Sequence, residues 1–115
     1  MLSAFYRFHG HGSLRYVYKN GQALRSHLVT IKYTSNPHRQ YSRFAVVVSK
    51  KVHKSAVGRN RIRRRLYEIV RHELPRFHSS HDVAIMVFSS ELISLQTEEL
   101  TEMIQQLFEQ AGLYK

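Results

Sequence analysis

Residues 55–72 combine an apolar stripe at helical spacing with a dense run of arginine, and this segment restricts the fold more than any other. At 100° per residue, one side of such a helix is apolar and must be buried. The buried stripe consists of Ile62, Leu66, Ile69 and Val70. Asn60, Arg64 and Arg71 fall near the opposite pole, so the sequence predicts a helix packed on a sheet with a strongly basic outer face.

The arginines of this helix indicate phosphate binding. Six of them within about three and a half turns repel one another in water, by a few tenths of a kcal/mol for each i,i+4 pair. The planar guanidinium suits bidentate contacts with phosphate and stacking on bases. Lys50, Lys51 and Lys54 come just before the helix, whose first N–H groups also favour anions. The sequence therefore predicts one continuous phosphate-binding strip.

Charge and length limit the class of protein. The 115 residues correspond to one domain, and the formal net charge is +10. Residues 1–90 hold 17 bases and 3 acids, whereas residues 91–115 hold five acids and one base. This asymmetry predicts a single RNA-binding domain over residues 1–115 with one basic face. The chain has no cysteine, and no apolar run could span a bilayer. Since the N-terminus has no signal-peptide pattern, we expect a cytoplasmic protein.

Periodicity predicts three helices and three main strands. Ser13 is expected to cap a helix that runs to Asn20 and stops at Gly21. Residues 24–34 alternate as one strand, with Leu28, Thr30 and Lys32 on one face and Val29, Ile31 and Tyr33 on the other. The other predicted elements are strands at 43–49 and 83–88 and helices at 55–72 and from Thr97. The order α-β-β-α-β-α predicts a two-layer α/β (α+β) sandwich around a small mixed sheet. The predicted core includes Phe44, Met86, Phe88, Met103 and Phe108.

One ordered set of motifs resembles a known family. Ser49-Lys50-Lys51 ends a strand, Ala56-Val57 follows a short linker, and Arg59-Asn60-Arg61 opens the basic helix. This order resembles the hallmark region of the bacterial ribonuclease P protein subunit. The segments 14–21, 82–85 and 97–108 are similar to the first helix, the strand after the basic helix and the last helix of that family.

The resemblance implies a fold and a function. It implies a left-handed βαβ crossover, a rare exception to the handedness rule. It implies that a catalytic RNA, with Mg²⁺ held through the RNA, removes the 5′ leader from precursor tRNA. The protein would then bind no cofactor itself, carry no catalytic residue, and be a monomer when free, with ribonuclease P RNA and precursor tRNA as partners and no membrane contact.

The resemblance also assigns site residues. The residues implied to contact RNA are Lys50, Lys51, Lys54, Arg59, Asn60, Arg61, Arg63, Arg64 and Arg65. The residues implied to line a cleft for the single-stranded leader are Leu14, Tyr18, Lys32 and Tyr33. Aromatic side chains in a positive groove suit single strands, because bases stack on them.

Two other functions stay open at the level of sequence. A non-enzymatic RNA-binding module, for instance one associated with the ribosome, would use the same basic helix on another RNA. A protein-only nuclease would use some of the eight histidines. His78, His81 and Asp82 have the spacing of metal ligands, but we expect no metal site because the chain offers no cysteine and the cluster falls in a predicted loop.

Overall fold

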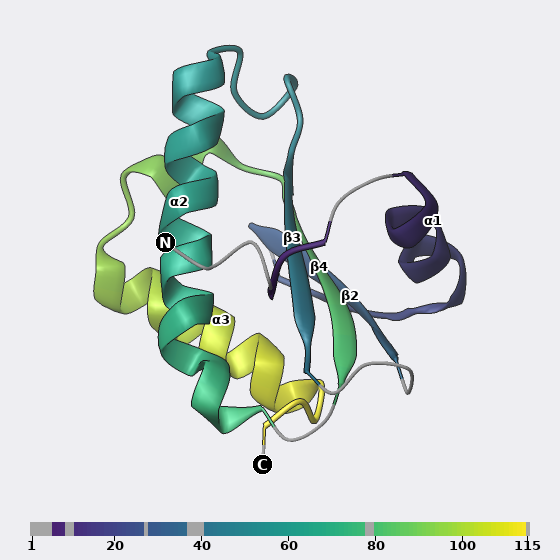
Figure 1. Cartoon of the computed structure of the whole chain (residues 1–115). Helices are drawn as coiled ribbons and strands as arrows, with labels where there is room; N and C mark the ends of the chain where they lie inside the picture. Colours follow the sequence, from purple (N-terminus) through teal and green to yellow (C-terminus); the bar gives the residue numbers. More distant parts are fainter. Residues whose placement is uncertain (1–5, 9–10, 27, 37–40, 78–79, 115) are drawn as a thin grey trace.

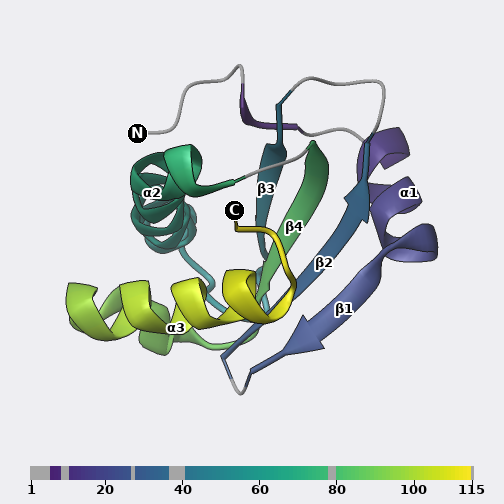
Figure 2. The same cartoon turned by 90° about the horizontal axis from the view of Figure 1, so that it is seen from below.

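Four strands form one mixed sheet that carries two helices on one face and one helix on the other (Figures 1 and 2). The computed structural model describes residues 6–8, 11–26, 28–36, 41–77 and 80–114. The helices are α1 (His11–Asn20), α2 (Ala56–Glu73) and α3 (Thr97–Gln110). The strands are β1 (Gln22–Arg25), β2 (Val29–Ser35), β3 (Arg43–Val48) and β4 (His81–Val87). Short 3₁₀ turns follow α2 and β4, at Leu74–Arg76 and Ser90–Ile93.

The sheet has the strand order β1-β2-β4-β3. All neighbours are antiparallel except β3 and β4, which are parallel and are joined through α2. In Figure 1 the chain rises along β3, crosses to α2, descends, and returns to β4 behind β3, which makes the crossover left-handed. The handedness implied by the family resemblance is therefore confirmed, against the usual preference for right-handed crossovers.

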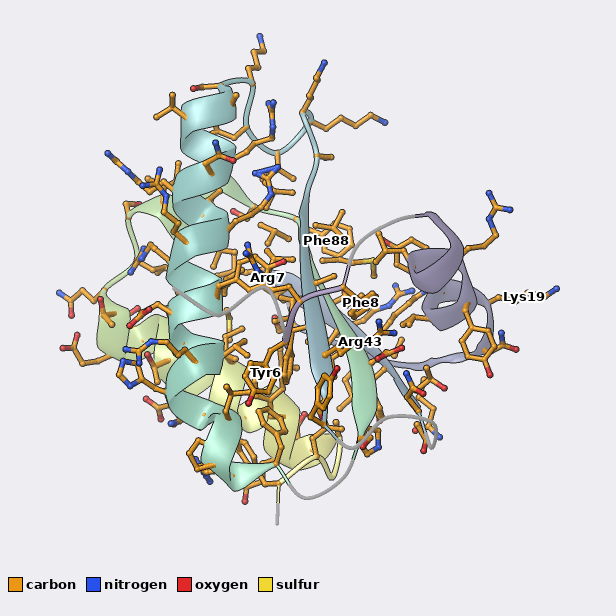
Figure 3. The ribbon with its side chains drawn as sticks, in the orientation of Figure 1. Tyr6, Arg7, Phe8, Lys19, Arg43 and Phe88 are labelled. Carbon is orange, nitrogen blue, oxygen red and sulfur yellow. The ribbon has the colours of Figure 1, made fainter. Side chains whose placement is uncertain are left out.

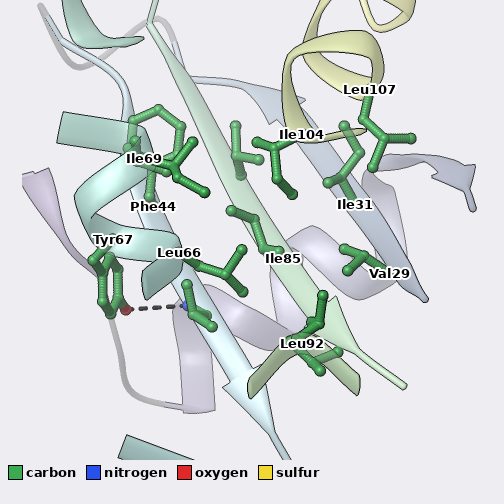
Figure 4. Packing of buried hydrophobic residues seen from close by; sticks show 14 of the residues in the cluster. Val29, Ile31, Phe44, Leu66, Tyr67, Ile69, Ile85, Leu92, Ile104 and Leu107 are labelled. Carbon is green, nitrogen blue, oxygen red and sulfur yellow. Dashed lines mark hydrogen bonds between the residues drawn. The ribbon is translucent and has the colours of Figure 1, made fainter. Parts of the chain in front are cut away.

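The main core lies between the sheet and the pair α2 and α3 (Figure 4). The predicted stripe of α2 is buried there, as are Phe44 and Phe108. The core also contains a buried hydrogen bond, in which the Val46 N–H donates to the Tyr67 hydroxyl at 3.1 Å. A smaller cluster on the other face packs α1 onto the sheet. It contains Phe8, Val17, Ala45 and Ala84.

The prediction of one strand over residues 24–34 is wrong. A tight turn after Ser26 divides this segment, and β1 folds back on β2 with Gln22 opposite Tyr33. The Ser26 side chain stabilises the turn, since its hydroxyl donates to the Val29 carbonyl at 2.9 Å and accepts from the Val29 N–H at 3.1 Å. Such local bonds compete with an extended strand. The predicted order consequently gains an edge strand, and Leu28 is buried in the main core instead of sharing a face with Thr30.

Two of the predicted helix ends agree with the structure, and one does not. The helix predicted from residue 55 begins at Ala56, and Ser55 is its N-cap, because the Ser55 hydroxyl accepts a hydrogen bond from the Gly58 N–H at 3.3 Å. The predicted cap of α1 is wrong, since that helix begins at His11 and contains Ser13. Gly21 ends α1 as predicted. A methyl group there would lie 2.5 Å from the Val17 carbonyl oxygen and 2.9 Å from that of Tyr33, so the close approach of α1 to β2 requires glycine.

Candidate nucleic-acid interface

The linker between β3 and α2 presents three lysines. Lys50, Lys51 and Lys54 are exposed beside the N-terminus of α2. The linker is held by His53, whose ring accepts a hydrogen bond from the Ser55 N–H at 3.2 Å and lies against Gly58. Figure 1 shows the linker at the end of the molecule where α2 begins. The predicted juxtaposition of strand end, lysines and helix start is therefore present.

Three polar side chains of α2 face outward on the predicted side. Asn60, Arg61 and Arg64 are exposed, and Arg63 is half-buried with its Nη1 donating to Asn60 Oδ1 at 2.7 Å. In the part of the chain that the structure describes, no carboxylate forms an ion pair with Arg61, Arg63 or Arg64. Their guanidinium groups are available to an anionic partner.

Two of the predicted RNA contacts have partners inside the protein. Arg59 Nη1 donates to the carbonyls of His53 and Lys54 at 3.0 and 2.9 Å, and so fixes the linker. Arg65 holds the segment that leads into α3. Its guanidinium donates at 2.5 to 3.0 Å to the carbonyls of Leu92, Ile93 and Leu95. These contacts assign both arginines a structural task within the fold.

The basic character of α2 ends at its last turns. Arg71 donates to both carboxylate oxygens of Glu68, at 2.6 to 3.2 Å. These hydrogen bonds lower the pKa of Glu68 to about 2. The pair therefore stays ionised at neutral pH, and Arg71 is compensated where Arg61 and Arg64 are not. The cationic strip covers the linker and the first half of α2.

A second basic surface lies on the face of the sheet that carries α1. A cavity of about 460 Å³ opens there beside α1. Its lining consists of Arg25, Ser26, Thr30, Lys32, Met86 and Phe88. Lys32 Nζ lies 5.4 Å from the centre of the Tyr18 ring, a cation–π contact. Burial raises the pKa of the Tyr18 hydroxyl, although 37% of the residue stays exposed.

The structure brings together two of the four predicted leader residues. Tyr18 and Lys32 share the open sheet face, whereas Leu14 is turned inward against the cluster beneath α1. Tyr33 points to the opposite face, packs against the main core, and donates through its hydroxyl to Gln22 Oε1 at 3.1 Å. The reason is the two-residue period of β2, which places Lys32 and Tyr33 on opposite faces.

Phe88 is the aromatic residue of this surface that the sequence reading missed. We predicted a core position, but 60% of Phe88 is exposed on the α1 side, as Figure 3 shows. The strand period carried the correct signal, since Ala84, Met86 and Phe88 alternate onto one face of β4. The sequence did not show that α1 covers Ala84 and leaves Phe88 open.

The described residues contain no group of three histidine, cysteine, aspartate or glutamate side chains that could hold a metal ion. Asp82 is engaged by Arg43, which donates to both of its oxygens at 3.0 and 2.8 Å, and by Asn36. His78, from the spacing noted in the sequence, lies outside the described residues. Over the same described ranges, no helix has the length and apolar character needed to cross a membrane.

Comparison with known proteins agrees with this geometry. The family model described as Ribonuclease P matches residues 2–112. A ribonuclease P protein component from Synechocystis is 32% identical over 97 residues, covering 84% of this chain and 77% of that protein. One from Prochlorococcus marinus is 36% identical over 115 residues, with 94% and 81% covered.

The fold has solved counterparts. The structure of the Staphylococcus aureus RNase P protein superimposes with a TM-score of 0.84 at 19% identity and covers 96% of this chain and 98% of that one. The match shows a shared fold, including the mixed sheet and its three helices. Since the family model spans nearly the whole sequence and the relatives exceed 30% identity over most of it, this chain belongs to the ribonuclease P protein family.

Proposed function

We propose that this chain binds the RNA subunit of ribonuclease P through the linker and first half of α2. As a ribonuclease P protein component it is part of an endoribonuclease that processes tRNA. The observation that carries the proposal is the row of exposed or half-buried cations without carboxylate partners among the described residues. The row consists of Lys50, Lys51, Lys54, Arg61, Arg63 and Arg64. Folded RNA is bound largely through phosphates and shape, which such a row matches.

The proposal assigns the chemistry to the RNA. In the described part of the chain the surface toward RNA is made of ammonium, guanidinium and amide groups, which suit phosphates and repel cations. The carboxylates of α2 and β4 form ion pairs, Glu68 with Arg71, Glu73 with Arg76 and Asp82 with Arg43. Mg²⁺, which supplies the hydrolytic chemistry when bound, would therefore be held by RNA oxygens, and the protein would orient and neutralise the RNA strands. The same proposal places the protein in the cytoplasm with its precursor tRNA.

The open sheet face is proposed to hold the 5′ leader of precursor tRNA. Tyr18 offers a ring for an unpaired base, and Lys32 beside it offers a cation for the adjoining phosphate. Single strands are bound by this combination of stacking and charge. The two surfaces lie on opposite sides of the sheet, as Figure 2 shows for α1 and α2. The protein could therefore contact the catalytic RNA and the leader at the same time.

Reconstitution tests the assignment. The protein is combined with a bacterial ribonuclease P RNA and a precursor tRNA at low Mg²⁺, and 5′ cleavage is followed on a gel. We expect cleavage only when protein and RNA are both present. Cleavage by the protein alone would overturn the assignment of the chemistry to RNA and support the protein-only nuclease. The ribosome-associated alternative is not favoured, because the relatives are ribonuclease P protein components.

Substitution of Tyr18 tests the leader surface. We expect Tyr18→Ala to weaken holoenzyme binding of precursor tRNA by about 1–3 kcal/mol, the value of one base stacked on an aromatic ring. Binding of mature tRNA by the holoenzyme, and of catalytic RNA by the protein, should stay unchanged. The three affinities and the melting temperature are measured on one variant. A uniform loss of affinity together with stability would show that Tyr18 only packs α1 on the sheet.

A further inference from the structure

Phe88 is a large apolar side chain that the fold leaves in solvent. It follows the last residue of β4, and its N–H donates to the Leu28 carbonyl at 2.9 Å, so its backbone is fixed by the sheet. The ring extends on the α1 side with 60% of the residue exposed (Figure 3). A fixed, exposed aromatic ring forgoes hydrophobic stabilisation, and such residues mark binding surfaces when polar groups surround them.

The surroundings of Phe88 identify the chemistry of a partner. Phe88 and Met86 form an apolar wall of the 460 Å³ cavity, and Arg25 and Lys32 line it with positive charge. Among the described residues, no carboxylate lines the cavity, and the sequence of residues 1–67 contains no acidic residue at all. An apolar partner alone would gain nothing from two cations. An aromatic ring next to a phosphate matches both features, and an unpaired nucleotide carries both.

Phe88 and Tyr18 are far apart along the sheet. Tyr18 is beside Lys32, which pairs across the sheet with Ala84. Phe88 comes four residues after Ala84, which is about 13 Å at the rise of a β-strand. Stacked bases on one strand are separated by about 3.4 Å. A base at Phe88 and a base at Tyr18 must therefore belong to different nucleotides of the strand.

We propose that Phe88 and Arg25 form a second base-binding position on the open sheet face, which takes an unpaired purine of the leader. This rests on the proposed leader contact and adds a specificity determinant to it. The Phe88 ring stacks on the base, Met86 backs the ring, and Arg25 binds the neighbouring phosphate. A purine is preferred because its two fused rings cover more of the apolar wall, and sequence preference in such sites arises from stacking strength.

An abasic scan of the leader tests this position. Precursor tRNAs that each lack one base of the leader are bound to the reconstituted holoenzyme, and their dissociation constants are compared with that of the intact precursor. We expect two sensitive positions with the unaltered protein. In Phe88→Ala, one of them should become insensitive and the intact precursor should bind about 5- to 150-fold more weakly, as for one lost stacking contact. Exchanging the purine at that position for a pyrimidine should weaken binding to the unaltered protein but not to Phe88→Ala.

A matched control is available on α1. Tyr16 is 56% exposed but does not line the cavity, so Tyr16→Ala should keep both sensitive positions. Tyr18→Ala should abolish the other position and keep the one assigned to Phe88. If the unaltered holoenzyme binds precursor and mature tRNA equally, the proposed leader contact itself fails. If it prefers the precursor but Phe88→Ala has the same abasic profile, only the second position is overturned.

Discussion

Arg64 and Arg65 are adjacent on α2 and have different surroundings. Arg64 is exposed, and no carboxylate in the described residues pairs with it. Arg65, one helical step further, is half-buried and donates to three backbone carbonyls before α3. A charged donor in such a position satisfies carbonyls that no strand or helix would satisfy. The chemical type of the residue is therefore the same at both positions, and only its surroundings determine whether it is available to RNA.

Alanine at each position separates the two roles. We expect Arg65→Ala to lower the free energy of unfolding by about 1.5–3 kcal/mol, because charge-assisted hydrogen bonds to the protein are lost. Arg64→Ala should change stability by less than about 0.5 kcal/mol. It should instead weaken binding of the catalytic RNA by about 1–3 kcal/mol, and Arg61→Ala should behave likewise. Denaturant unfolding and RNA titration of each variant measure this. An Arg64→Ala protein that unfolds easily but binds RNA normally would contradict the assignment.

At the scale of elements, the position of α1 determines the shape of the open sheet face. The helix is anchored by Val17 in the small cluster and ends at Gly21, where its last turn meets β2. The Gly21 N–H donates to the Val17 carbonyl at 2.8 Å. Because both neighbouring atoms at Gly21 are backbone oxygens, neither can rotate away from a larger residue. The distance between Tyr18 and Lys32 therefore depends on this junction.

Gly21→Ala tests the junction. We expect the added methyl group to lower the free energy of unfolding by about 1–3 kcal/mol, the usual cost of overpacking. It should also reduce the preference of the holoenzyme for precursor over mature tRNA, since α1 must shift relative to the sheet. Lys19→Ala, at an exposed position on the same helix, serves as the control with unchanged stability. Full stability of Gly21→Ala would show that α1 can move away without cost.

At the scale of the molecule, the charges are separated by the sheet. The cations of the linker and α2 and those around Tyr18 lie on different sides, and α3 begins with Glu98 and Glu99 in its first turn. Acids at this end suit the helix dipole and keep the stretch 97–110 unattractive to phosphates. The molecule therefore has two cationic surfaces, which we propose for RNA, and one helix whose first turn is acidic.

The salt dependence of RNA binding follows from the cationic strip. About six exposed or half-exposed cations remain after Arg59 and Arg65 are assigned to the fold. We expect affinity for the catalytic RNA to fall roughly 10³-fold between 50 and 200 mM salt, through release of counterions. Arg61→Ala should reduce the slope by about 1, whereas Phe88→Ala should leave it unchanged. Titrations at a series of salt concentrations measure the slope, and a nearly flat dependence would contradict the assignment of this surface.

The sequence determined the features that depend on periodicity and on local chemistry. The stripe of α2, the stop at Gly21 and the apolar strands predicted at 43–49 and 83–88 follow from residue spacing. The structure confirms them, with strand bounds of Arg43–Val48 and His81–Val87. The basic strip also follows, because neighbouring charges on one helix need no knowledge of distant residues. The family resemblance added the left-handed crossover, which spacing alone could not show.

Only the tertiary structure decided which polar groups the fold uses for itself. Residue spacing could not show that Arg65 donates to backbone carbonyls, because those carbonyls lie 27 to 30 residues away along the chain. Glu73 is another case, since it is buried and accepts hydrogen bonds from Arg76, Gln105 and the Tyr114 hydroxyl. Gln105 and Tyr114 are distant in the sequence, so spacing did not show these contacts. The turn after Ser26 and the exposure of Phe88 likewise depend on where β1 folds back and how far α1 covers the sheet. Residue spacing fixes the face on which a side chain lies, but coverage by another element determines whether that face is buried.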